Sequence, residues 1–435
     1  MSSPHETLVQ LDVVVVGAGL GGLATAISIA RSGSKVTVFD AAKELQEVSL
    51  FPPMNAFSWL SWSNFEIPHI TQIGAGLQLT PNSTKILQRW DLPETLWAAA
   101  AEPTSLTVHR YTGPMLAKDP DFAQNIRARY GAPFVDMHRV DLQRALYEKA
   151  RALGVQFRLG EKVVDLALER DRPEVVTSEG TRTAADLVIA ADGLWSRCRS
   201  RFLGRDDPPK PTGDLAYRVV LKLDQIPDPD LRRRVAEPAV HFWIGPYAHA
   251  VGYSLRGGNM YNIVLLVPDD LPPGVSRQEG SVEEMKALFE GWDPVLSRFL
   301  GLVNHVDKWK LMHPQGANSA IEDGAVLGLV LGHIQSRDQV PQALAMYEKL
   351  RKARGESIVR ETFKQRDDFH IPDGPEQEAR DQIFLSQLGK ELKGPFPSRW
   401  TCPQVQPWLY GYDAYEEVEN AVKQEPFSKT GVVTT

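Results

Sequence analysis

Hydrophobic residues near the start of the chain form two runs on either side of a glycine-rich turn. The first run, residues 11–16, is apolar and largely β-branched, which is typical of a strand buried on both faces of a parallel sheet. Residues 23–31 after the glycines predict a helix, which ends at residues 32–34, Ser-Gly-Ser. Residues 35–39 predict a second strand, and Asp40 follows it. This order of elements is that of a βαβ unit.

Three glycines between the first strand and the helix have the spacing of a dinucleotide-binding turn. Gly17 allows the tight turn, Gly19 lets a pyrophosphate approach the backbone, and Gly22 lets helix and strand pack closely. The N-terminus of the helix offers free N–H groups and a partial positive charge to phosphates. Asp40 would accept hydrogen bonds from the ribose hydroxyls and repel a 2′-phosphate, which favours FAD or NAD over NADP. The alternative is a structural turn that binds nothing.

Hydrophobic and polar residues alternate in the middle of the chain, between residues 213 and 304. This pattern predicts an antiparallel sheet, with strands at 215–223, 241–244, 249–255 and 261–267 separated by Gly, Pro and Asp turns. Tyr247, His249, Val251 and Tyr253 alternate along one of these strands. They are therefore expected to line a pocket together.

The pattern becomes helical after residue 340. Residues 342–369 are rich in charge, with apolar residues at loosely helical spacing, and predict a long helix. Residues 372–407 are interrupted by prolines and are expected to wrap the surface.

Composition and charge narrow the class of protein. The 435 residues include 48 Lys and Arg against 55 Asp and Glu, and a net charge of -7 argues against a nucleic-acid partner. Cys198 and Cys402 are too few for a disulfide framework and fit a reducing compartment. The longest apolar runs, 13–16 and 325–331, are far shorter than the ~20 residues of a membrane helix. We therefore expect a cytoplasmic protein with no membrane span; the oligomeric state stays open.

Several further motifs carry a resemblance to a known family. They are Ile73–Gln78, His138–Leu142, Ala185–Gly193, Ala216–Arg218, Gln315–Gly324 and Trp408–Asp413. With the glycine turn, they resemble the flavoprotein aromatic hydroxylases typified by p-hydroxybenzoate and salicylate hydroxylases, and most closely the fungal branch that hydroxylates phenolic polyketides. The resemblance implies an α/β fold with a Rossmann-like FAD-binding domain, an antiparallel-sheet substrate domain and a C-terminal helical region. It also implies FAD as cofactor, NAD(P)H as co-substrate and a small phenolic substrate.

The resemblance implies cofactor contacts for further residues. Arg139 would lie along the pyrophosphate or adenosine side of FAD, with a solvated helix-end arginine as the alternative. Ala75 and Gly76 would pass close to the flavin or its ribityl chain. Asp192 would lie near the cofactor groove. The helix beginning near Gly316 and Asn318 would direct backbone N–H groups at the flavin.

The same resemblance implies where catalysis occurs. Hydroxylation in this family runs through a flavin C4a-hydroperoxide that attacks an electron-rich ring. Arg218 is the expected catalytic residue, because a nearby guanidinium lowers the pKa of a phenol and fixes its position. Tyr253 would supply a second hydrogen bond to the substrate oxygen, unless it is a core tyrosine. For His249 a core role is favoured.

The chain divides into parts on this basis, and it departs from the family twice. The parts are a first FAD-binding part, 1–213; a substrate sheet, 214–304; a second FAD-binding part, 305–370; and a C-terminal extension, 371–435.

Residues 48–72 are an aromatic insert that we interpret as a retained intron, with a lid or membrane-contacting loop as the alternative. Between residues 309–313 and Pro314 the chain lacks a strand and the family's Gly-Asp motif, whose Asp binds the ribityl hydroxyls. Two alternatives to a monooxygenase follow: a flavin oxidoreductase that inserts no oxygen, and a non-catalytic relative with impaired FAD binding.

Overall fold

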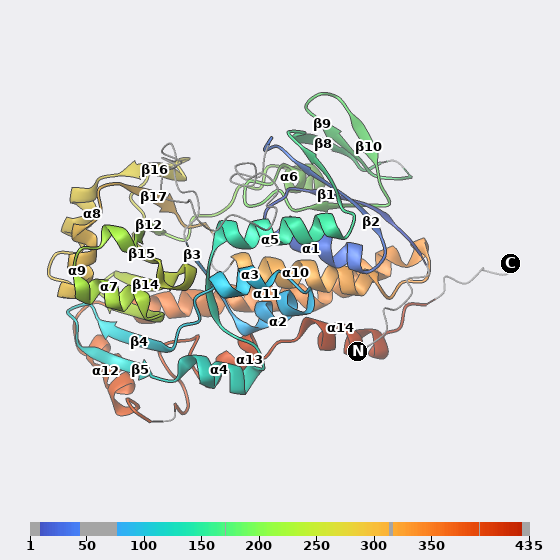
Figure 1. Cartoon of the computed structure of the whole chain (residues 1–435). Coiled ribbons are helices and arrows are strands. Elements are labelled where there is room, and N and C mark those ends of the chain that lie inside the picture. Colours follow the sequence, from blue (N-terminus) through green and yellow to red (C-terminus); the bar gives the residue numbers. More distant parts are fainter. Residues whose placement is uncertain (1–8, 44–75, 170, 313–315, 391, 429–435) are drawn as a thin grey trace, which may run out of the picture.

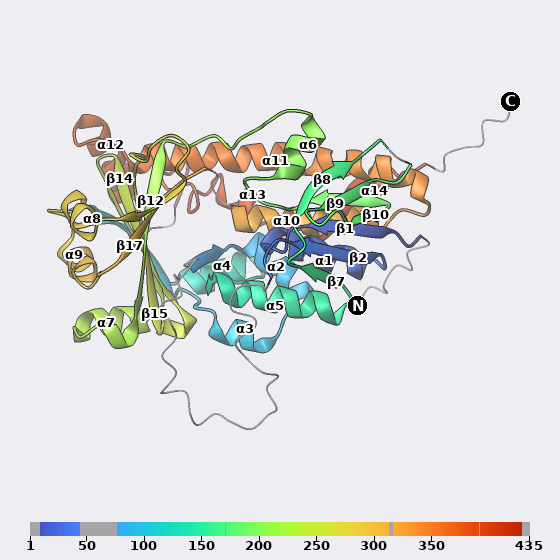
Figure 2. The same cartoon turned by 90° about the horizontal axis from the view of Figure 1, so that it is seen from above.

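Two sheets at opposite ends of the molecule organise the chain, as Figures 1 and 2 show. The computed structural model describes residues 9–43, 76–169, 171–312, 316–390 and 392–428. The proposed insert at 48–72 and Ala75 lie outside these residues. A long helix, α11 (Val340–Phe369), runs alongside both ends (Figure 2).

The N-terminal βαβ unit forms as predicted. β1 (Asp12–Val16), α1 (Leu20–Arg31) and β2 (Lys35–Asp40) are continued by β7 (Gln156–Leu159) and β11 (Leu187–Ala190) into a parallel sheet of order β11-β1-β2-β7. Helix α10 (Gly316–Leu331) packs so closely on α1 that a Cβ at Gly324 would lie 2.6 Å from the backbone nitrogen of Thr25. The FAD-binding fold predicted from the glycine turn is confirmed in its architecture.

In the described part of the chain, the parallel sheet ends at β11. The side chains of Leu187, Val188 and Ile189 are partly exposed, in contrast to the four buried valines of β1. β17 (Val306–Lys310) pairs with the other sheet, and α10 begins only a few residues after it. The prediction that the chain lacks a strand and the family's Gly-Asp motif refers to this edge of the parallel sheet. It stays a prediction.

The second sheet has eight strands in the order β16-β17-β12-β15-β14-β13-β4-β5. The four strands predicted from alternation are confirmed with slightly longer bounds: β12 (Asp214–Lys222), β13 (Ala239–Gly245), β14 (Ala248–Leu255) and β15 (Met260–Pro268). The sheet extends beyond residues 214–304, because β4 (Ser105–Arg110), β5 (Met115–Asp119) and β17 also belong to it. β16 (Arg277–Gly280), which lies within those residues, forms one edge. β4 lies parallel to β13, a long-range pairing that local alternation does not reveal.

The two faces of the second sheet have different neighbours. Tyr217 and Val219 of β12 are buried in a core with three helices, α7 (Pro229–Ala236), α8 (Val282–Leu288) and α9 (Pro294–Gly301). Because side chains alternate along a strand, Arg218 points to the opposite face, toward the rest of the molecule.

The remaining elements include two small sheets, β10-β9-β8 and β3-β6, and further helices. They are β3 (Gly76–Leu79), α2 (Pro81–Arg89), α3 (Glu94–Ala99), α4 (Phe122–Tyr130), β6 (Val135–His138), α5 (Arg139–Ala152), β8 (Val163–Ala167), β9 (Glu174–Thr177), β10 (Arg182–Ala184), α6 (Arg197–Leu203), α12 (Pro375–Ser386), α13 (Gln406–Tyr410) and α14 (Ala414–Gln424). The prolines of the C-terminal extension do not keep it irregular: Pro375 occupies the first turn of α12, where no backbone N–H is needed. None of the helices in the described part of the chain is long and apolar enough to cross a membrane.

A buried ion-pair network holds α2, α10 and α11 together. Glu322, fully buried in α10, lies 2.7 Å from both Arg351 and Arg354 of α11 and accepts a hydrogen bond from Asn82 of α2. Burial alone would raise the pKa of Glu322, but the two guanidiniums outweigh it and hold the pKa below its ordinary value. The carboxylate therefore stays ionised and fixes β3, which leads into α2, against α10.

Removing the charge of Glu322 should destabilise the protein strongly. Glu322→Gln leaves two buried guanidiniums short of their counter-charge, and we expect a loss of about 3–5 kcal/mol in the free energy of unfolding. Urea denaturation followed by circular dichroism measures it. Glu348→Gln, which breaks an exposed pair with Lys352 on the same helix α11, should change little. Equal effects of the two substitutions would contradict the role given to the network.

Candidate active site

The glycine turn has the geometry of a phosphate-binding loop. Gly17 has a φ of 109°, and a Cβ there would lie 2.3 Å from the carbonyl oxygen of Ala191. A Cβ at Gly22 would lie 1.9 Å from the carbonyl oxygen of Gly17, so helix and strand touch there. The space around Gly19 is different: no described atom comes within 4 Å of the position of its Cβ. Gly19 is also the N-cap of α1, and no side chain caps that helix end. An anion can therefore reach the first N–H groups of α1.

Two acids predicted near the cofactor form hydrogen bonds within the chain. Asp40 accepts one from the backbone nitrogen of Ala18 at 2.6 Å and one from Ala42 at 2.8 Å, so it braces the glycine turn. A carboxylate has further lone pairs, and Asp40 remains partly exposed. Asp192 caps α6 by accepting from Ser196, at 2.5 Å, and from the backbone nitrogens of Arg197 and Cys198. The side chain of Asp192 thus shapes the turn after β11.

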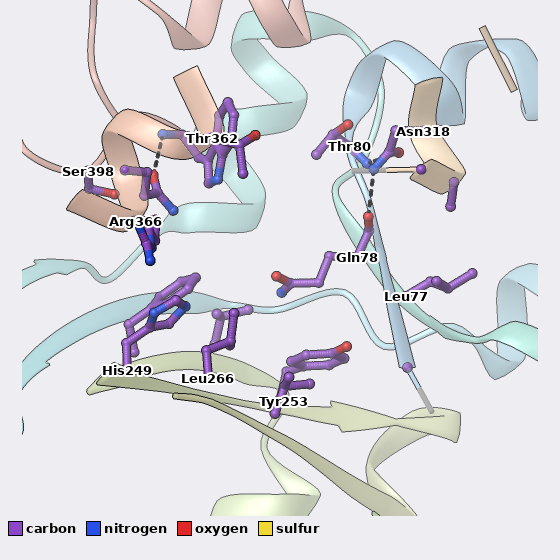
Figure 3. A pocket seen from close by; sticks show the side chains of 18 of the residues that line it. Leu77, Gln78, Thr80, His249, Tyr253, Leu266, Asn318, Thr362, Arg366 and Ser398 are labelled. Carbon is purple, nitrogen blue, oxygen red and sulfur yellow. Dashed lines mark hydrogen bonds between the residues drawn. The ribbon is translucent and has the colours of Figure 1, made fainter. Parts of the chain in front are cut away.

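A cavity of about 420 Å³ lies between β3, the large sheet, the start of α10 and the end of α11 (Figure 3). Its polar groups include Gln78, Asp214, Arg218, His249, Tyr253, Asn318 and Arg366, and its apolar walls include Leu106, Phe134, Val240, Phe242, Val264 and Leu266. The two predicted catalytic residues, Arg218 and Tyr253, and three predicted cofactor residues, Gly76, Gly316 and Asn318, all line this cavity. Walls that are more apolar than polar, with polar groups at defined places, suit an aromatic ligand.

Arg218 enters the cavity without a counter-charge. Its Nε is buried and makes no hydrogen bond, and no described carboxylate forms an ion pair with it. Its guanidinium lies 5.7 Å from the ring centroid of Trp309. Burial lowers the pKa of Arg218.

Arg139 is the second cation of the site. It is the first residue of α5, it forms no ion pair within the described residues, and its pKa is lowered by burial and then by the charge of Arg218. The charges of Arg139 and Arg218 are thus close enough to repel each other, and neither is paired with a carboxylate of the described residues. Such a pair favours an anionic ligand.

Tyr253 is packed against Gly76. A Cβ at Gly76 would lie 2.4 Å from the Cε2 atom of Tyr253, so glycine is required there by the tyrosine ring itself. The backbone nitrogen of Gly76 donates to Asn262 at 3.2 Å, which ties β3 to the large sheet. Tyr253 is 3% exposed, burial raises its pKa far above the ordinary value, and its hydroxyl donates to no described residue. It is thus both a core residue and a free hydrogen-bond donor at the cavity wall.

The strand that carries Tyr253 only partly matches the predicted pocket face. Tyr247 lies in the turn between β13 and β14, with a φ of 59° and 61% exposure, and it does not line the cavity. The prediction for Tyr247 is wrong because the strand begins one residue later, at Ala248. His249, for which a core role was favoured, lines the cavity and also contacts His370.

Asn318 acts through its side chain on β3. Its amide donates to the carbonyl oxygen of Gln78 at 2.9 Å and accepts from the backbone nitrogen of Thr80 and the hydroxyl of Ser83 (Figure 3). This clamp sets the distance between α10 and β3. Gly316, the exposed first residue of α10, also lines the cavity.

Sequence reasoning missed a buried carboxyl behind the cavity. Asp136 of β6 is fully buried; Gln78 donates to one of its oxygens at 3.1 Å, and the other oxygen has no partner. Burial raises the pKa of Asp136 well above its ordinary value. Asp136 resembles any strand-end acid in sequence, and only the pairing of β3 with β6 places it beside Gln78.

The residues present fit FAD. The open N-terminus of α1 suits a pyrophosphate, Asp40 lies at the end of β2 where a ribose would bind, and the unpaired Arg139 and Arg218 lack an anion. The cavity walls suit a planar ring. FAD bound in this way would extend from the glycine turn to the cavity, past β3.

Substitution of Gly19 should weaken FAD binding without unfolding the protein. Gly19→Val places a side chain in open space, so the urea midpoint of the FAD-free protein should stay close to that of the wild type. The side chain blocks approach to the first N–H groups of α1, and the Kd for FAD should rise about tenfold or more. Flavin fluorescence quenching measures the Kd. Gly301→Val, at another glycine with open space but in α9, is the matched control. A wild-type Kd in Gly19→Val would exclude this loop as the phosphate site.

Comparisons with known proteins agree with this geometry. A family model described as FAD dependent oxidoreductase matches residues 77–314, and one described as FAD binding domain matches residues 12–49. The FAD-dependent monooxygenase OpS4 of Beauveria bassiana (strain ARSEF 2860) is 44% identical over 445 residues, covering 95% of this chain and 97% of that protein. That alignment is longer than the chain, so OpS4 contains residues that this chain lacks.

Two further proteins are similar along most of their length. A 3-hydroxybenzoate 6-hydroxylase of Klebsiella oxytoca is 29% identical, covering 92% of this chain and 97% of its own. A solved salicylate hydroxylase in a substrate complex superposes with a TM-score of 0.72 at 18% identity, covering 97% of this chain and 99% of that one. The second likeness shows that the fold is shared.

Proposed function

This chain belongs to the FAD-dependent monooxygenases, and from that membership we propose that it hydroxylates a phenolic ring with FAD, NAD(P)H and dioxygen. Relatives that act on 3-hydroxybenzoate and on 3-amino-4-hydroxybenzoate by their names support a hydroxylated aromatic substrate. A small phenol, including one derived from a polyketide, is the substrate class we propose. Two buried cysteines that form no disulfide, Cys198 and Cys402, support action in a reducing compartment such as the cytoplasm.

The observation that carries this proposal is the unpaired guanidinium of Arg218 in an apolar cavity. A phenol bound there can place its oxygen beside Arg218 while Leu106, Phe134 and Phe242 enclose the ring. The positive charge favours the phenolate, and the low polarity of the walls strengthens that attraction. A phenolate directs more electron density to its ring carbons than a phenol does, which prepares the ring for attack by an electrophilic oxygen.

Other residues of the cavity would orient the ring and the cofactor. Tyr253 can donate its free hydroxyl to the substrate oxygen, and Gln78 reaches into the cavity from β3 (Figure 3). Reduced FAD, when bound, supplies the electrons that activate dioxygen. We propose that Gly17, Gly19, Gly22, Asp40 and Arg139 hold its ADP half, and that Gly76, Gly316 and Asn318 border its ring end. Asp192 supports this region by shaping the turn beside Gly17.

One observation favours a second candidate, a relative with weakened FAD binding. The parallel sheet ends at a partly exposed β11, and OpS4 contains residues that this chain lacks. A missing ribityl contact would cost about 1.5–3 kcal/mol of FAD binding energy. FAD would then be lost during purification and return only when it is added in excess.

Replacement of Arg218 should strongly reduce turnover of a phenol. We expect Arg218→Met, loaded with FAD, to lose about a hundredfold in kcat/KM, because a charged group that stabilises a developing anion is removed. The assay combines NADH or NADPH with salicylate and 3-hydroxybenzoate as probe phenols. It follows oxygen uptake and searches by mass spectrometry for a product that contains one added oxygen atom. Arg233→Met, at an exposed arginine of α7, is the control.

The outcomes of this assay separate the candidates. A hydroxylated product in the wild type and in Arg233→Met, but not in Arg218→Met, supports the proposal. Oxidation of the nicotinamide with hydrogen peroxide as the only product, for every phenol tried, indicates an oxidoreductase that inserts no oxygen. A protein that shows no flavin absorbance even with excess FAD is the non-catalytic relative.

A further inference from the structure

A second cavity, of about 650 Å³, adjoins the first one. It lies between β4, β5, α4 and the part of the chain that follows α12, all of which Figure 1 shows in the same region of the molecule. Two residues, Leu106 of β4 and Thr401, line both cavities. The two cavities are therefore separated by a wall that is one side chain thick at these residues.

Apolar side chains form much of the second cavity. Leu106 and Val108 of β4 lie on one face of the sheet, and Ala117 of β5 lies on that face too because it is paired with Val108. Phe384 of α12 and Phe396 also line the cavity, and their rings pack edge to face with centroids 5.0 Å apart. A ligand in this cavity would therefore contact mainly aliphatic and aromatic carbon.

Polar side chains of the second cavity already have partners within the chain. Asn125 donates to Asp119 at 2.9 Å, and Arg129 donates to Gln406 at 3.3 Å. Among its described lining residues, no buried side-chain nitrogen or oxygen lacks a hydrogen-bond partner, in contrast to the Nε of Arg218 in the first cavity. The second cavity thus offers space and apolar surface, but no unpaired group that requires a polar ligand.

Hydrogen bonds fix the segment that carries Thr401. Gln406 accepts from the hydroxyl of Tyr130 in α4 at 2.8 Å and donates to the carbonyl oxygen of Trp400 at 2.8 Å. The backbone nitrogen of Trp400 donates to Gln365 of α11 at 3.3 Å. Because Thr401 is held from both sides in this way, the boundary between the cavities is shaped by the chain itself.

We propose that the second cavity holds a long apolar substituent of the substrate, which extends between Leu106 and Thr401 from a phenol ring bound at Arg218. This inference rests on the proposed function, because it extends the site that binds the phenol. The first cavity has to hold the ring end of FAD as well as a phenol ring, so a chain of several carbons on that ring needs space beyond it. The substrate class is then a phenol that carries such a chain, and Leu106 and Thr401 determine specificity for it.

Binding of phenols with short and long chains tests the second cavity. Isothermal titration calorimetry gives the Kd of the FAD-loaded protein for 3-methylphenol and 3-pentylphenol, and for the corresponding 4-isomers. Both isomers are used because the position of the chain on the ring decides whether it reaches Leu106. Each buried methylene tightens binding about fourfold. We therefore expect the wild type to bind the pentyl compound of at least one series about tenfold more tightly than the methyl compound, or more tightly still.

Two substitutions fill the second cavity from different walls. Ala117→Phe fills it from β5, and Leu388→Trp fills it from the chain after α12; both residues line the second cavity and not the first. We expect each variant to prefer the pentyl compound only about twofold or less. The matched controls are Ala152→Phe at the exposed end of α5 and Leu385→Trp at an exposed position of α12, which line neither cavity. The controls should keep the preference of the wild type.

Each result supports or overturns the inference. Loss of the preference in Ala117→Phe and Leu388→Trp, with the wild-type preference in both controls, supports it. An unchanged preference in Leu388→Trp overturns it, even if Ala117→Phe does not fold. Equal Kd values of the wild type for methyl and pentyl compounds, in both series, also overturn it, while the proposed phenol site stands. If the wild type binds none of the four phenols, the proposed function fails, and the inference fails with it.

Discussion

The structure places the charges of Arg139 and Arg218 close enough to repel each other, and no carboxylate of the described residues is paired with either. Arg139 starts α5, Arg218 comes from the middle of β12, and burial lowers the pKa of each. Like charges at a partly buried site cost free energy unless a ligand or solvent offsets them. The rest of the molecule forms a binding site for such a ligand. The N-terminus of α1 is open to a phosphate at one end of this site, and the apolar cavity lies at the other. A bound anion would turn this repulsion into attraction.

The acids that could neutralise the two guanidiniums are paired with other arginines or are buried. Asp214 is paired with Arg366, Glu322 is enclosed by Arg351 and Arg354, and burial raises the pKa of Asp136, which disfavours its charged form. The clamp from Asn318 to β3 and the contact of Gly76 with Tyr253 fix the cavity between the two sheets. Each of these contacts is made entirely within the chain, so the cavity is shaped before any ligand binds.

Local patterns predicted the βαβ unit, the four central strands and the long helix α11, because periodicity and glycine spacing depend on nearby residues. The expectation that Arg218 lies at the substrate came from the resemblance to a known family, and Arg218 lines the cavity. Patterns could not predict what depends on distant pairing. The partner of Gly76 is Tyr253, the edge strands of the large sheet come from residues 105–119 and 277–310, and His370 meets His249 across 121 positions. The prediction for Tyr247 was wrong because this residue lies in the hairpin turn between β13 and β14, although the alternation of apolar and polar residues continues through it.

The stability of the FAD-free protein with and without Arg218 tests the central claim most directly. The free energy of unfolding in urea is compared for the wild type and Arg218→Met, both without ligand. If Arg218 is an unpaired cation held for an anionic ligand, the variant should be as stable as the wild type or more stable, and the wild type alone should gain when a phenolate is added. A loss of about 3 kcal/mol or more in the ligand-free variant, the size expected for breaking a buried ion pair, would show that Arg218 serves the fold and contradict the account.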